Sequence, residues 1–144
     1  MITLDVSAGA RGLAALVGRA VALDQIAVAR FQLLGKGSVD VFVTTPFDCI
    51  AARRIEGAVS RDGAVVTARQ LRDALRDAPR GESQEIGPAV DASWPGALPP
   101  AGGFAERDTV PVAVAHQLAN EGRSLARQFS GPACLLYTSD AADE

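Results

Sequence analysis

Arginines supply the most suggestive chemistry in this sequence, because two groups of them have a spacing suited to phosphate binding. One group is a consecutive pair and the other recurs along an expected helix: Arg53, Arg54, Arg69, Arg72 and Arg76. A guanidinium binds phosphate through parallel hydrogen bonds, so these residues are a candidate nucleic-acid interface. A solvated helix face is the simpler interpretation, since Asp73 lies four residues after one arginine and three before another.

Other reactive side chains are too few to form a catalytic set. His116 is the only histidine, and Cys49 is the only cysteine before residue 134. We expect Cys49 to be a buried, inert thiol in a strand, and His116 to be a surface or helix-packing residue. One histidine and one cysteine cannot make a zinc site. The sequence therefore predicts no catalytic residues, no cofactor and no metal.

Composition indicates a globular protein. The chain has 144 residues, of which 48% are hydrophobic and 22% charged, and its formal net charge is −3. This apolar content exceeds that of disordered chains, and no apolar run approaches the roughly 18 residues of a membrane span. The N-terminus has no basic segment followed by an apolar one, so we expect a cytoplasmic protein without membrane contact.

The first helix and the first strand are expected near the N-terminus. Apolar residues between positions 13 and 21 recur with a helical period, which predicts a helix that ends near Leu23. Ser7 is the expected N-cap, because its hydroxyl can accept from free amides of the first turn. Residues 2–5 are expected to form a short edge strand.

Alternating apolar residues predict three strands between residues 25 and 56. The alternation covers 27–33, 39–44 and 49–55, and Gly35-Lys36-Gly37 supplies the hairpin between the first two. Pro46 suits the turn before the third strand. The product is a small three-stranded antiparallel meander.

Two further helices complete the expected α+β fold. Thr67 and Gln70 form a capping box for a helix that ends at Pro79. The Pro/Gly-rich residues 79–107 are an expected connector, from which Trp94 folds back onto the domain. A helix over 109–129 follows. We expect an α+β domain over 1–78 with helices packed on one face of its sheet, and a C-terminal helix within 108–133 packed on it.

The last eleven residues form a separate segment. Their sequence, CLLYTSDAADE over 134–144, resembles the translation of a transposase sequencing adapter. The resemblance implies a non-native tail and a C-terminally truncated fragment. The segment carries three acidic and no basic residues, so residues 1–133 hold 14 basic and 14 acidic side chains. This balance argues against broad electrostatic binding of nucleic acid or anionic membranes.

Three segments together resemble a known family. They are the residues from Val110 to Pro132, the stretch RAVALD at 19–24, and Thr45-Pro46-Phe47. They are similar to a family of uncharacterised actinobacterial proteins over residues 1–133, whose members continue beyond the Ser-Gly-Pro segment. The resemblance implies no particular activity and no catalytic residues.

Three functions remain open from the sequence. The first is a non-enzymatic binding or regulatory domain, with the helix 109–129 contacting a protein partner or a missing C-terminal region. The second is nucleic-acid binding through the arginine clusters. The third is an enzyme whose catalytic residues lie in the missing part.

Overall fold

The computed structural model describes residues 1–77 and 82–130. The chain divides into two units, Met1–Ala101 and the residues from Gly102 onward, which are described separately. The predicted tail at 134–144 and the predicted helix end at Pro79 lie outside the described residues.

A six-stranded antiparallel sheet forms the first unit. Its strands are β1 (Ile2–Ala8), β2 (Val28–Gly35), β3 (Ser38–Thr44), β4 (Ile50–Val59), β5 (Val65–Thr67) and β6 (Gln84–Gly87). Their order in space is β5-β2-β3-β4-β1-β6. The α+β class is confirmed, but the expected three-stranded meander, which corresponds to β2, β3 and β4, is only half of the sheet.

The missed strands have weak local signals. β5 is three residues long and merges into the capping box, and β6 lies within the Pro/Gly-rich stretch that was expected to be irregular. β1 was expected at an edge, but it lies between β4 and β6, where Leu4 pairs with both Val59 and Gln84. The strand expected over residues 2–5 is therefore confirmed, and only its edge position is wrong. β5 and β6 were missed because their pairing partners are distant in the sequence, so local patterns do not reveal them.

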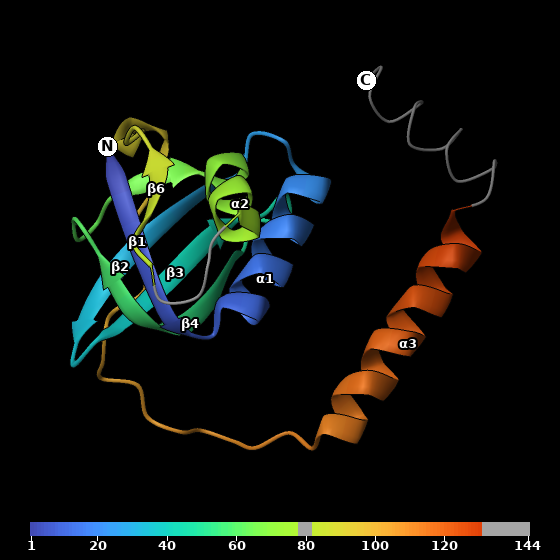
Figure 1. Ribbon diagram of the computed structural model, residues 1–144. Helices are drawn as coiled ribbons and strands as arrows, with labels where there is room; N and C mark the ends of the chain where they lie inside the picture. The colour runs from blue at the N-terminus through green and yellow to red at the C-terminus, as the bar shows by residue number, and fades with distance from the viewer. Residues whose placement is uncertain (78–81, 131–144) are drawn as a thin grey trace. The chain divides into compact units, whose positions relative to one another are not determined.

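Helices α1 (Ala10–Leu23) and α2 (Ala68–Asp77) pack on the same face of the sheet (Figure 1). We call this the helix face and the opposite side the outer face. Alternate residues of each strand point to the helix face and meet apolar side chains of both helices. The largest fully buried members of this core are Phe31, Leu13, Ile55 and Leu71.

Of the two predicted helix starts, the cap of α1 is wrong and the cap of α2 is confirmed. Ser7 is not the N-cap of α1, because it lies within β1 and Gly9 occupies the cap in a left-handed conformation. The capping box of α2 is confirmed. The backbone amide of Gln70 donates to the Thr67 hydroxyl at 3.2 Å, and the backbone amide of Thr67 donates to the side-chain oxygen Oε1 of Gln70 at 3.3 Å.

The second unit contains α3 (Val112–Phe129). The helix was expected over 109–129, but it begins at Val112 with Pro111 as its N-cap residue. None of the described residues of α3 is buried. The packing of this helix on the first unit stays a prediction.

Gly57 permits the close pairing of β4 with β1. The register of this pair shifts between Val6 and Ala8, and Gly57 pairs with Val6 at φ +154°. A Cβ at this position would overlap the carbonyl oxygen of Asp5. Both the backbone conformation and the available space therefore require glycine.

Gly57→Ala is expected to lower the free energy of unfolding by about 3 kcal/mol or more, because the β1–β4 ladder must separate locally. Urea unfolding followed by circular dichroism measures this change. Gly18→Ala is the control, since no described atom outside the backbone of α1 lies within 4 Å of the position its Cβ would take. It is expected to be neutral or to stabilise by up to about 1 kcal/mol. Equal stability of both variants would contradict the steric argument.

Candidate functional site

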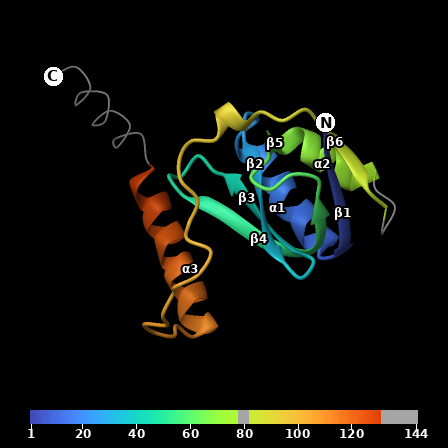
Figure 2. The same ribbon diagram turned by 90° about the vertical axis from the view of Figure 1, so that its left-hand side faces the viewer.

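A segment that we call the strap, residues 88–101, runs from β6 past β5 towards the β3–β4 turn (Figure 2). The Val90 amide donates to the Val65 carbonyl at 2.8 Å, and the Val65 amide donates to Asp91 Oδ1 at 2.9 Å. The strap thus satisfies both outward backbone groups of Val65 on β5, which is one of the two edge strands. These bonds tie the chain leaving β6 to the opposite edge, so the sheet is nearly closed.

Asp91 is the main polar anchor of the strap. Both of its carboxylate oxygens accept from Arg61 Nη2, at 2.9 and 2.6 Å. The Val65 amide and the Arg61 guanidinium favour the charged carboxylate and so lower the pKa of Asp91 below its ordinary value of 3.8. The Asp91 side chain is about half exposed, so solvent screens its ion pair.

Trp94 is the apolar anchor of the strap. Its ring lies 5.8 Å from the guanidinium carbon of Arg30 on β2, within the range of a cation–π interaction. The prediction that Trp94 folds back onto the domain is confirmed, since its side chain is only partly exposed. Trp94 Nε1 and Arg30 Nε are both buried and have no hydrogen-bond partner among the described residues.

A cleft of about 760 Å³ lies between the strap and the β3–β4 turn. Pro95, Leu98 and Pro99 form apolar walls on the strap side, while Asp48 and Cys49 line the turn side. The Thr45 hydroxyl donates to the Cys49 carbonyl at 2.6 Å and closes the turn. The cleft therefore combines apolar walls with one thiol and one carboxylate.

The expectation that Cys49 is buried is wrong. This residue is exposed, because β4 begins only at Ile50 and Cys49 belongs to the preceding turn. Its Sγ lies 3.3 Å from the Thr45 hydroxyl, which is not a general base. Among the described residues there is also no group of three side chains suited to hold a metal ion.

The structure separates the consecutive arginines. Arg54 lies on the outer face, where its guanidinium bonds both oxygens of Asp40 at 2.8 and 2.9 Å. Arg53 lies on the helix face, with its guanidinium beside Gly12 of α1. Successive residues of a strand point to opposite faces, so this pair cannot form one patch.

The other three arginines lie together on α2 and have polar partners. Arg69 donates to Gln25 at 3.2 Å, and Arg72 bonds Asp73 at 2.8 Å. Arg76 pairs with Asp77 at 3.3 Å and lies 3.9 Å from Asp73. The expected ion pairing around Asp73 is present, although Arg72 replaces Arg69 as the closer partner.

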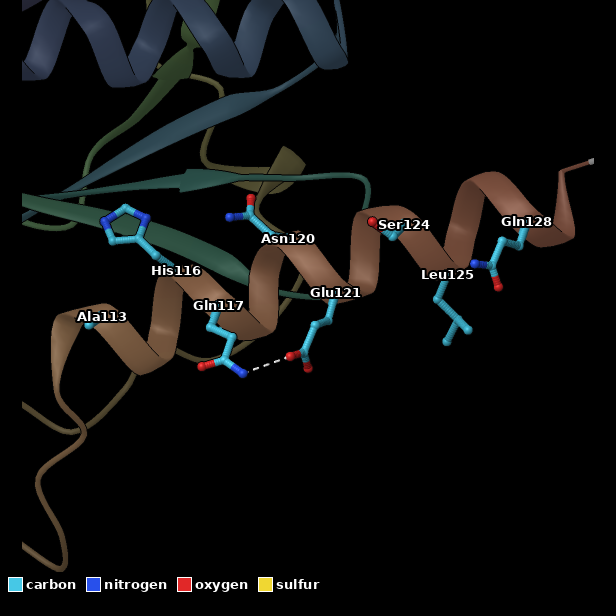
Figure 3. A pocket seen from close by; sticks show the side chains of 8 residues that line it. All are labelled: Ala113, His116, Gln117, Asn120, Glu121, Ser124, Leu125 and Gln128. Carbon is cyan, nitrogen blue, oxygen red and sulfur yellow. Dashed lines mark hydrogen bonds between the residues drawn. The ribbon is translucent and has the colours of Figure 1, made fainter.

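α3 has a polar and an apolar side. A hollow of about 690 Å³ is lined only by residues of α3. Figure 3 shows its lining side chains, among them His116, Gln117 and Asn120. Because one helix supplies every wall, it is an open groove between side chains rather than an enclosed site. The larger side chains of the apolar side are 41–64% exposed: Val114, Leu118, Leu125 and Phe129. These positions follow the helical period of the sequence.

These features define an α+β domain with a nearly closed antiparallel sheet, two helices on one face and a strap that completes an edge. The chain belongs to the family described as Domain of unknown function (DUF8010), whose model matches residues 1–96. The match includes the strap anchors Asp91 and Trp94 and ends before α3. Comparison with curated proteins and with solved structures gives no match. Within the described ranges, every helix is too short or too polar to cross a membrane.

Acid is expected to release the strap. A carboxylate whose folded pKa is depressed stabilises the folded state above its unfolded pKa, and this stabilisation is lost as pH falls through the folded value. Emission from Trp94, the only tryptophan in the chain, should therefore shift to longer wavelength below about pH 4. Asp91→Asn should shift the emission partly at neutral pH and weaken the acid transition.

Asp77→Asn is the matched control for this titration, because the side-chain partner of Asp77 is Arg76 on α2. Its acid transition should resemble that of the original chain. An unchanged acid transition in Asp91→Asn would show that this carboxylate does not hold the strap.

Proposed function

We propose that this protein is a non-enzymatic, cytoplasmic binding module that makes protein contacts through the apolar side of α3. The observation that carries the proposal is the exposure of Leu118, Leu125 and Phe129, at 59%, 56% and 64%, along one side of the helix. Contiguous apolar surface of this kind is typical of interaction sites. Its burial would contribute about 25 cal/mol for each Å² removed from water.

The division of the chain supports this proposal. The family domain ends before α3, so the domain and the helix can have separate roles as a folded scaffold and a contact surface. The exposed thiol of Cys49 suits a reducing compartment, which supports the cytoplasmic location. Nucleic-acid binding is less well supported, because the arginines are divided between two faces of the sheet and most have carboxylate partners.

Photo-crosslinking in the native host tests the protein-contact function. A photoreactive amino acid at Leu118 is expected to give crosslinked protein products of defined mass. The same group at Gln117, on the polar side, is the matched control and should give few. Equal yields at both positions, or none at either, would contradict a specific contact through the apolar side.

Chromatography on heparin separates this proposal from the nucleic-acid alternative. The chain is expected to pass through the column at about 50 mM salt, because its net charge is negative and three of the five candidate arginines are paired with carboxylates. Salt-sensitive retention that Arg72→Ala and Arg76→Ala both weaken would favour the nucleic-acid alternative instead.

A further inference from the structure

We propose that the cleft between the strap and the β3–β4 turn binds a small organic ammonium compound with an apolar body. The residues that line the cleft fall within 44–50 and 95–99, and all of them belong to the first unit. The site is therefore separate from the protein contacts assigned to α3, and either one can fail without the other.

The size and the walls of the cleft suit an organic molecule. Its volume of about 760 Å³ lies within the range of roughly 300–1,000 Å³ that is typical of small-molecule pockets. Pro95, Leu98 and Pro99 form one wall, and Ile50 opposite them is 39% exposed. The proline rings fix their backbone φ angles, so this wall loses little conformational entropy when a ligand binds. An apolar body would remove surface from water on both walls.

The hydroxyl groups of the cleft already donate their hydrogen bonds within the protein. The Thr45 hydroxyl donates to the Cys49 carbonyl at 2.6 Å. The Thr44 hydroxyl donates a longer bond, of 3.5 Å, to the Val28 carbonyl and accepts from the Val28 amide at 3.0 Å. A hydroxyl has a single proton to donate. The strongest polar group left among the lining side chains is the Asp48 carboxylate, which only accepts, so the ligand must supply the donor.

Charge points to the same kind of ligand. Asp48 is the only charged residue that lines the cleft, and among the described residues it takes part in no ion pair. By contrast, Asp40 and Asp91 are paired with arginines at 2.8 and 2.6 Å. An anionic ligand would meet a like charge without a compensating cation. An ammonium group brings a positive charge and three donors, which match a carboxylate.

An organic cation fits the cleft better than a metal ion. Asp48 and Cys49 are the two lining side chains with common metal-binding groups, and the described residues contain no group of three such side chains. A carboxylate and a thiol also prefer different metals. The apolar walls, moreover, contribute to binding only when the ligand has an apolar body.

Protection of Cys49 from iodoacetamide measures binding at this site. Cys49 is exposed and lines the cleft, so a bound ligand should slow its alkylation. Cys134→Ser leaves it as the only cysteine of the full chain. The probes at pH 7 are octylamine, octanol and octanoate, which have similar chain lengths. Octylamine should protect at concentrations at least about threefold lower than octanol, and octanoate should protect least. Equal protection by all three, or none by octylamine, overturns the proposal.

Asp48→Asn tests the role of the carboxylate. Asp48 has a φ of +55°, a left-handed conformation that asparagine also adopts, so the turn should keep its shape. The variant should bind octanol as the original chain does but lose the preference for octylamine. Asp77→Asn removes the same charge from α2 and should retain that preference. A preference that survives in Asp48→Asn, or that disappears in both variants, overturns the proposal.

Leu98→Ala tests the apolar wall. It should weaken protection by octylamine and by octanol by the same factor, at least about threefold, because both lose the same apolar contact. Leu125→Ala makes the same change on α3, in the second unit, and should alter neither. Equal effects of the two leucine variants would contradict binding in the cleft. Better protection by the peptide acetyl-Leu-Lys-Leu-amide than by octylamine would assign the cleft to a protein segment and overturn a small-molecule site.

Discussion

The outward backbone groups of Val65 impose the constraint on which the first unit depends. β5 is an edge strand, and an edge amide and carbonyl need partners from water or from the chain. Here Asp91 and Val90 supply both partners. This pairing brings the strap back across the sheet, places Trp94 over Arg30 and forms one wall of the cleft. One pair of hydrogen bonds thus links sheet closure to the cleft beside the β3–β4 turn.

Local signals in the sequence predicted local structure well. The Thr67–Gln70 capping box and the β2–β3 hairpin were correct, because residues adjacent in sequence determine them. β5 and β6 were missed, and β1 was predicted but placed at an edge, because these strands pair with strands far along the chain and such pairing leaves no local pattern. Cys49 was misplaced for a related reason: its apolar neighbours suggested a strand, while the turn closed by Thr45 begins the strand one residue later.

The candidate functional sites could likewise be predicted only where a single element forms them. Arg53 and Arg54 are neighbours in sequence, yet strand geometry places them on opposite faces. The apolar stripe of α3 was predictable because helical periodicity alone defines it. The strap was not, since the role of Asp91 depends on Val65 and Arg61, which lie far from it in sequence. Sequence patterns therefore identified single-element surfaces, but not sites assembled from several elements.

The central place of β1 has a consequence for synthesis of the chain. This strand is synthesised before both of its partners, which are Val59 on one side and Gln84 on the other. Pairings between distant residues slow folding, and nascent β1 has no complete sheet to join until β6 has emerged. During that interval its apolar residues, including Ile2 and Leu4, are unprotected. The first unit can therefore complete its sheet only after the residues up to Gly87 have been synthesised.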